Sequence, residues 1–195
     1  MVDRHACWWW SICADVHRDG DLGWVRRRDE SWREFQLSER LGQFNQQQYG
    51  EAESTFKEAV EMDAESSNAW NGLGWARFHQ GKHDEAIEAF ERCLEIEPNQ
   101  AGAENGLGQL YLSRGDFECA EKYLLNAAPT AAAWFGLARL YLLQENFTEA
   151  LVWITKIESQ QGLTPVMKQM KDAAEKKELP ADLRAMLAPT ASGPR

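Results

Sequence analysis

Four side chains near the start of the chain are of the kinds that bind zinc. His5, Cys7, Cys13 and His17 bring two imidazoles and two thiols close together in sequence. Zinc modules with paired cysteines place about two to four residues between them, whereas residues 8–12 separate Cys7 from Cys13 here. We therefore predict no metal site and no cofactor, and these four residues remain the one alternative candidate for a metal site.

The other groups capable of chemistry do not form a catalytic pattern. His79, His83 and Ser113 lie at positions that solvated helix faces and turns explain, and the sequence has no glycine-rich phosphate loop or nucleophile elbow. Cys93 and Cys119 fall on helical segments, where a thiol most simply serves as a small packing residue. The chain is therefore predicted not to be an enzyme.

The elements that position these side chains repeat along the sequence. Ala52, Ala86 and Ala120 are spaced 34 residues apart, and Ala150 follows after a step of 30. A period of about 34 residues is typical of a helix–turn–helix unit that cannot bury its apolar face alone. Such units must stack, which predicts an all-α solenoid.

The residues around these alanines carry a family resemblance. The landmarks of the three clearest units are Trp70, Leu73, Gly74, Gly81, Ala86, Phe90 and Pro98, then Leu107, Gly108, Tyr111, Gly115, Phe117, Ala120 and Leu124, then Trp134, Leu137, Ala138, Tyr141, Phe147, Ala150 and Ile154. In this pattern the chain resembles the tetratricopeptide repeat (TPR) family. The resemblance implies a right-handed superhelix of antiparallel helix pairs. One departure is Arg77, which stands where the next units have Tyr111 and Tyr141 and is expected to loosen the packing.

The domain boundaries follow from the repeat register. We predict a tryptophan-rich N-terminal segment at 1–32, with a hairpin within 11–28, and four TPR-like units over 33–160. The units span about 33–66, 67–100, 101–130 and 131–160, followed by capping helices at 161–188 and a tail at 189–195. The first capping helix begins at Pro165 with Thr164 as its cap, and a second segment from Pro180 is expected to pack behind it.

Turns between the paired helices show their own signal. Gly81 and Gly115 follow the first helix of their units, where a left-handed backbone ends a helix. Asn146 lies at the matching turn of the last unit and also tolerates that conformation. We therefore expect a left-handed residue at each of these three turns.

In the TPR family, a partner's peptide or helix lies in the groove lined by the first helices of the repeats. The resemblance implies that this groove is lined here by Asn71, Trp75, Phe78, His79, Asn105, Gln109, Leu112, Ser113, Phe135, Arg139, Leu142 and Leu143. TPR domains that hold the C-terminal carboxylates of heat-shock chaperones use lysines and arginines together with asparagines. The asparagines are present and the lysines are absent, so that activity is not predicted.

A second feature of the same helices is a glycine before the leucine of each unit. Gly72, Gly106 and Gly136 recur at this position, although glycine inside a helix costs about 1 kcal/mol relative to alanine. One interpretation is a smooth track for a ligand backbone; the other is a tolerated glycine copied by duplication. The track interpretation predicts that alanine at all three positions stabilises the fold slightly and weakens ligand binding.

Charge and composition limit the partners. The net charge is -10, and the excess of acidic residues lies in the repeats, which disfavours nucleic acid and favours a protein or peptide ligand that is apolar or basic. No stretch approaches the ~20 apolar residues of a membrane span, and no signal sequence is evident, so we expect a cytoplasmic protein.

The predicted function is a noncatalytic scaffold that binds a partner's peptide or helix in the concave TPR groove. The alternative is a C-terminal TPR targeting or assembly module of a larger enzyme, with 1–34 as the end of its catalytic domain. The N-terminal tryptophans also suggest self-association, because exposed tryptophans at this density need to be covered.

Overall fold

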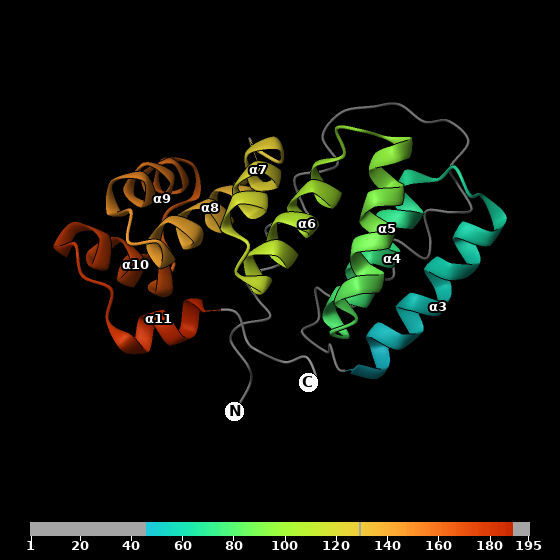
Figure 1. Ribbon diagram of the computed structural model, residues 1–195, viewed down its shortest axis with the longest axis horizontal. Coiled ribbons are helices and arrows are strands. Elements are labelled where there is room, and N and C mark those ends of the chain that lie inside the picture. Colours follow the sequence, from blue (N-terminus) through green and yellow to red (C-terminus); the bar gives the residue numbers. More distant parts are fainter. Residues whose placement is uncertain (1–45, 129, 189–195) are drawn as a thin grey trace. The chain divides into compact units, whose positions relative to one another are not determined.

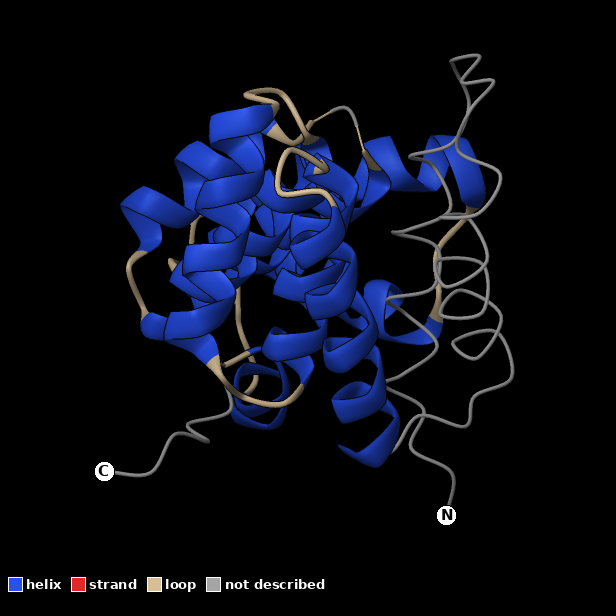
Figure 2. Cartoon of the chain, turned by 90° about the vertical axis from the view of Figure 1, so that its right-hand side faces the viewer, coloured by secondary structure: helices blue, strands red, loops and turns tan. Residues whose placement is uncertain are grey.

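The computed structural model describes residues 46–128 and 130–188, and every regular element in these ranges is an α-helix (Figure 1 and Figure 2). Several predictions lie outside the described residues. They are the metal candidate formed by His5, Cys7, Cys13 and His17, the N-terminal segment with its hairpin and self-association, and the tail at 189–195.

The helices fall into two compact units, and the boundary lies within α6. Unit 1 ends at Gly106 and contains α3 (Gln46–Met62), α4 (Ser67–His79), α5 (His83–Ile96) and the start of α6 (Ala101–Arg114). Unit 2 begins at Leu107 and contains the rest of α6, α7 (Phe117–Asn126), α8 (Ala131–Leu143), α9 (Phe147–Gln161), α10 (Pro165–Lys176) and α11 (Ala181–Leu187). The predicted all-α fold is confirmed.

In unit 1, α4 packs against both α3 and α5. Phe56 of α3 and Leu73 of α4 are buried in one apolar cluster. Helix α5 buries an apolar stripe as well, with Ala86, Phe90 and Cys93 fully inaccessible to solvent. The 3.6-residue periodicity of these helices therefore sets which face enters the core.

In unit 2, α8 is the central helix and packs against α7 and α9. Most of its side chains are buried, among them Trp134, Leu137 and Leu140. Helix α10 packs against α9, and it buries Met167 and Met170. A helix that is apolar on nearly all sides must be enclosed by its neighbours, so α8 forms the centre of this unit.

The recurring glycines serve close helix packing, and their interpretation as a ligand track is wrong. A Cβ built on Gly72 would lie 2.5 Å from Cζ of Phe56, and one built on Gly106 would lie 2.5 Å from Cε2 of Phe90. At Gly136 the nearest atoms belong to Leu124 and Gln109, both at 2.7 Å. Side chains of the protein fill the space beside each glycine, so alanine is expected to be destabilising there.

Two of the three predicted turn residues have the expected backbone. Gly81 and Gly115 both have a φ of 76°. In the last unit the left-handed residue is Glu145, with a φ of 59°, and not Asn146. Asn146 is the N-cap of α9, and its side chain accepts a hydrogen bond from the Glu149 backbone N–H. An asparagine suits both places, and here capping prevails.

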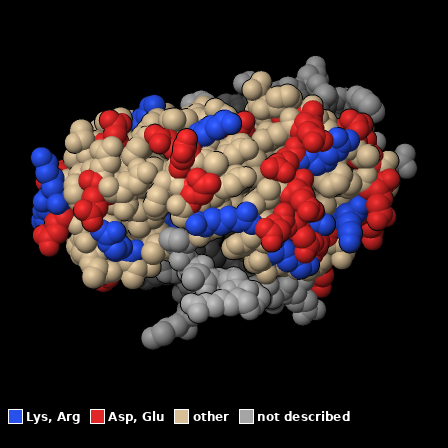
Figure 3. Space-filling view, in the orientation of Figure 1, with Lys and Arg blue, Asp and Glu red and all other residues tan. Residues whose placement is uncertain are grey.

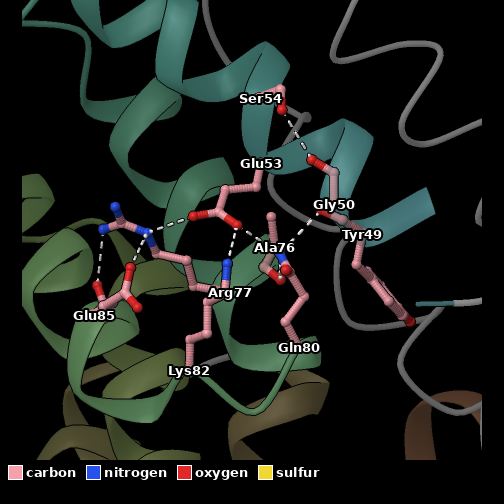
Figure 4. Close-up of polar contacts among 9 residues, drawn as sticks. All are labelled: Tyr49, Gly50, Glu53, Ser54, Ala76, Arg77, Gln80, Lys82 and Glu85. Carbon is pink, nitrogen blue, oxygen red and sulfur yellow. Dashed lines mark hydrogen bonds and ion pairs between the residues drawn. The ribbon is translucent and has the colours of Figure 1, made fainter. Parts of the chain in front are cut away.

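Arg77 does not loosen the junction between α3 and α4. Its guanidinium Nε lies 3.3 Å from Oε1 of Glu53, and the same carboxylate accepts hydrogen bonds from Lys82 at 2.6 Å and Gln80 at 2.9 Å (Figure 4). Arg77 also donates to the backbone carbonyl of Glu85 at 3.1 Å. A polar network thus replaces the apolar packing that a tyrosine would provide.

An equivalent hydrogen bond between neighbouring repeats occurs in unit 2. The hydroxyl of Tyr141 on α8 donates to the Glu121 carboxylate on α7 at 2.5 Å. Glu121 follows Glu53 by two periods of 34 residues, and Tyr141 is the repeat equivalent of Arg77. In both units, therefore, a glutamate of one repeat's second helix accepts a hydrogen bond from the next repeat's first helix.

The predicted capping region contains two helices, with two differences from expectation. Thr164 precedes α10 as predicted, but its side chain forms no capping hydrogen bond. Helix α11 begins after Pro180 and contacts α8. This contact with the first helix of the last repeat was not predicted, and Leu183 and Leu187 of α11 also belong to the buried cluster that contains Met170 and Ala173 of α10.

Candidate partner-binding faces

The predicted binding residues of α4 share one face of the helix. Asn71, Trp75, Phe78 and His79 are spaced at steps of three and four residues, plus one adjacent pair. The Trp75 ring packs edge-on against Phe78 and against Phe90, each with ring centroids 5.4 Å apart. The face is therefore an aromatic cluster supported by the core residue Phe90.

His79 is part of this cluster. Its imidazole stacks on Tyr49 of α3, with centroids 4.6 Å apart and planes at 14°, and it lies 5.4 Å from the Phe78 ring. Burial lowers the pKa of His79 to about 4 because the charged imidazolium loses its hydration. His79 is therefore neutral at pH 7 and contributes a flat ring and no positive charge.

Two asparagines occupy equivalent positions in successive repeats of unit 1. Asn71 and Asn105 are 6% and 2% exposed. The side-chain oxygen of Asn71 and both polar atoms of Asn105 have no hydrogen-bond partner in the described part of the chain. The Asn71 amide lies beside Gly102, where a built Cβ would be 3.0 Å from its nitrogen. Buried amides left unpaired in this way are unusual and call for an explanation.

In unit 2, the predicted residues come from α6 and α8. Gln109 and Leu112 of α6 are buried, as is Leu142 of α8, whereas Phe135 and Arg139 are half-buried. Phe135, Arg139 and Leu142 are spaced by four and three residues and thus share one stripe of α8. Apolar residues flank the one cation of this face.

Arg139 is held by neutral oxygen atoms. Its Nε donates to the backbone carbonyl of Leu187 at 2.6 Å, and one terminal nitrogen donates to Oε1 of Gln109 at 3.4 Å. No carboxylate forms an ion pair with Arg139 among the residues that the structure describes. Burial lowers the pKa of Arg139 to about 10, so the group stays charged at pH 7 while the two oxygen atoms that it contacts here are neutral.

Two contributors to these faces were not predicted from the sequence. Tyr49 stacks on His79, and Leu187 of α11 contacts Arg139 through its carbonyl. The sequence predicted only that a segment from Pro180 would pack behind the first capping helix. Its docking onto α8 was not visible, because spacing identifies a face without identifying its neighbour.

The surface charge is mixed. On the face seen in Figure 3, Asp and Glu side chains gather over α3 to α5, with Lys and Arg side chains among them. Ion pairs such as Arg92 with Glu65, at 3.1 Å, contribute to this pattern. Exposed pairs of this kind contribute at most about 1 kcal/mol each, so their main effect is on the surface that a partner meets.

Groups capable of catalysis are engaged in structural contacts. The Ser113 hydroxyl donates to the Leu110 carbonyl at 2.7 Å, and His83 stacks on Phe78. Within 46–128 and 130–188 no three metal-binding side chains form a group that could hold an ion. In the same ranges, no helix has the length and apolar character required to cross a bilayer.

Comparisons with known proteins agree with this architecture. A model described as "Tetratricopeptide repeat" matches residues 41–104 and again residues 105–161, and a second model of that description matches 77–132. No curated protein sequence gives a significant match. A solved structure of MamA is similar with a TM-score of 0.58 at 18% identity, over 78% of this chain and 86% of that chain. A structure titled "YrrB: a TPR protein with an unusual peptide-binding site" gives a TM-score of 0.51 at 19% identity, over 74% of this chain and 80% of that chain.

Proposed function

Because the chain belongs to the tetratricopeptide repeat family, we propose that it is a noncatalytic scaffold that binds a peptide or helix of a partner protein on the first helices of its repeats. The TPR fold serves protein interaction in general. The proposed contact residues are Asn71, Trp75, Phe78 and His79 of α4, Asn105, Gln109 and Leu112 of α6, and Phe135, Arg139 and Leu142 of α8.

The observation that carries this proposal is that the side-chain oxygen of Asn71 and both polar side-chain atoms of Asn105 are buried without a hydrogen-bond partner among the described residues. A buried polar group without a partner costs about 1–3 kcal/mol, and here the cost recurs at the same position of two repeats. An amide side chain can donate to a peptide carbonyl and accept from a peptide N–H. Because both residues are almost inaccessible in the free chain, a bound peptide backbone would pair with these amides only after their side chains turn toward the ligand.

The ligand's side chains follow from the neighbouring groups. Trp75, Phe78 and neutral His79 form an aromatic surface suited to apolar side chains. Acidic residues over α3 to α5 favour a basic flank on the partner. The similarity to YrrB, whose title names a peptide-binding site, is consistent with a peptide ligand.

The test uses a peptide selected from a displayed library on the full chain. Asn71→Leu/Asn105→Leu removes both amides while approximately retaining side-chain volume, and Asn68→Leu, at an exposed position of α4, is the matched control. We expect the double variant to melt at or above the wild-type temperature and to bind the selected peptide at least ~10-fold more weakly. The control should bind as the wild type does.

Trp75→Ala is not a clean alternative for this test. Trp75 is only 4% exposed and packs on Phe90, so its truncation would cost about 3–5 kcal/mol of stability. Loss of binding in that variant would reflect loss of folding. Wild-type affinity in a folded Asn71→Leu/Asn105→Leu variant would show that the amides do not contact the ligand.

A further inference from the structure

Helix α11 lies on α8 as a small amphipathic ligand would. Leu183 and Leu187, one turn apart, are 4% and 3% exposed and belong to the buried cluster that includes Leu142. Met186, between them in sequence, is 48% exposed. Helix α11 therefore docks through one narrow stripe, and its other side faces solvent.

Two polar contacts fix the direction of α11. The Leu187 carbonyl, at the C-terminal end of α11, accepts the 2.6 Å hydrogen bond from Arg139. Arg184, one turn earlier, forms an ion pair with Glu145, just beyond the end of α8. Helix α11 thus runs from the C-terminal end of α8 back toward its middle. Arg139 satisfies a carbonyl that the end of a helix leaves without an intrahelical partner.

Glu145 gives a second sign that this contact has a role. It adopts a left-handed φ of 59° at a turn where the two preceding repeats have Gly81 and Gly115. A glutamate is less favourable than glycine in that conformation. The glutamate supplies the carboxylate that pairs with Arg184, which a glycine could not do.

We propose that the α8 face formed by Phe135, Arg139 and Leu142 is a helix-docking surface that α11 occupies, and that its external partner is an amphipathic helix bearing two leucines four residues apart and a carboxylate at its C-terminal end. Helix α11 is then an internal competitor of that partner. This inference rests on the proposed scaffold function and names the partner class for unit 2.

Two features indicate that a partner helix can displace α11 from α8: the short length of α11 and the neutral oxygen atoms that Arg139 contacts. A seven-residue helix is too short to be stable without its docking contacts, and residues 177–180 tether it to α10. Arg139 meets a neutral carbonyl where a carboxylate would form a stronger, charge-assisted bond. A helix that ends in a carboxylate can therefore bind the same face more tightly than α11 does.

The test uses the full chain and a labelled synthetic peptide with the sequence of residues 179–187. This peptide ends in a free carboxylate at the position of the Leu187 carbonyl, and a second peptide is amidated there. The receptors are wild type, the α11 variant Leu183→Ser/Leu187→Ser, and the control Met186→Ser at the exposed position of α11. Circular dichroism and the melting of unit 2 confirm that each receptor is folded, and binding is read by fluorescence anisotropy.

We expect the Leu183→Ser/Leu187→Ser receptor to bind the carboxylate peptide at least ~10-fold more tightly than wild type or Met186→Ser does. Amidation of the peptide, or Arg139→Gln in the same receptor, should weaken binding ~10-fold. Equal affinity for all three receptors, or no binding to a folded α11 variant, would overturn the inference.

These outcomes are separable from those of the scaffold proposal. A library-selected peptide that depends on Asn71 and Asn105 while the α11 peptide binds no receptor would support the scaffold and refute the competitor. A folded α11 variant that binds its peptide while the asparagine variant retains full affinity for the selected peptide would do the reverse.

Discussion

Gly106 provides the sharpest test of how the repeats pack, through its replacement by alanine. Phe90 is completely buried, and a Cβ on Gly106 would lie 2.5 Å from its Cε2 atom. The ring has little room to move toward α4, because a Cβ on Gly74 would lie 2.6 Å from its Cδ1 and Cε1 atoms. Trp75 packs edge-on against the same ring. The alanine methyl therefore has to displace a ring that is enclosed by its neighbours.

The magnitude follows from two opposing effects. Ordinary contact needs about 3.4–4 Å, so the ring or the helix must shift by roughly 1 Å. Overpacking of this kind costs about 1–3 kcal/mol, and the cost should be at the upper end because the ring is confined on both sides. The better helix propensity of alanine offsets about 1 kcal/mol. The expected result is a net loss of about 1–2 kcal/mol in the free energy of unfolding.

The assay is thermal unfolding of the full chain, with Gly50→Ala as the matched control. Gly50 also lies within a helix, α3, but a Cβ there meets no atom within 4 Å. This control should gain up to about 1 kcal/mol from propensity alone. For a chain of this size, 1 kcal/mol shifts the melting temperature by about 2–4 °C, so the two variants should melt on opposite sides of wild type.

A rescue variant distinguishes a clash with Phe90 from any other effect. Phe90→Leu shortens the side chain, so the penalty of Gly106→Ala should shrink by at least about 1 kcal/mol in that background. The reasoning is refuted if Gly106→Ala raises the melting temperature as Gly50→Ala does. It is also refuted if the penalty is unchanged beside Leu at position 90.

Two further predictions concern titratable groups of unit 1. Burial raises the pKa of Glu53, but hydrogen bonds from Lys82, Gln80 and Arg77 outweigh burial and lower this pKa below 4.5 overall. The contribution of the Glu53 carboxylate to stability is therefore complete above about pH 4.5, and it is lost as the pH falls through the lowered pKa. Glu53→Gln should lower the free energy of unfolding, measured in urea, by about 1–3 kcal/mol at pH 7 and by less at pH 3. The exposed control Glu58→Gln should change it little at either pH. An equal loss for Glu53→Gln at both pH values would contradict this expectation. The NMR signals of the His79 ring protons should titrate near pH 4 in the folded chain and near pH 6.5 in urea. The neutral ring therefore contributes stability that is complete above pH 6.5 and declines toward pH 4. A titration near pH 6.5 in the folded chain would show that the ring is hydrated.

The repeat period was sufficient to predict the fold, because each unit places the same apolar residues on the same helix faces. The buried stripe of α5 and the glycine turns at Gly81 and Gly115 were predictable for this reason. The site was less accessible to sequence reasoning. The family resemblance assigned Phe135, Arg139 and Leu142 to the groove lining, but it did not indicate that α11 would contact Arg139.

The incorrect expectations arose where two physical effects compete at one position. Gly72 fits either an open track or a close approach of side chains, and only the position of Phe56 distinguishes the two. Asn146 suits a left-handed turn and an N-cap equally, and the left-handed turn fell to Glu145. Arg77 was expected to loosen the packing, because its sequence position does not indicate that Glu53 lies within hydrogen-bonding distance. Each case depended on a neighbour distant in sequence.

The pairing of a glutamate with either Arg77 or Tyr141 has a consequence for how such chains can grow. The acceptor carboxylate occurs at Glu53 and Glu121, whereas the intervening repeat has Ile87 at the equivalent position. Where the carboxylate is present, the donor is a guanidinium in one repeat and a phenol in the other. A repeat added by duplication would therefore not need to keep its donor residue, provided that the new residue reached the carboxylate with an N–H or O–H group. The contact therefore tolerates exchange of its donor residue. A change of donor in one repeat does not require a compensating change in the repeat before it.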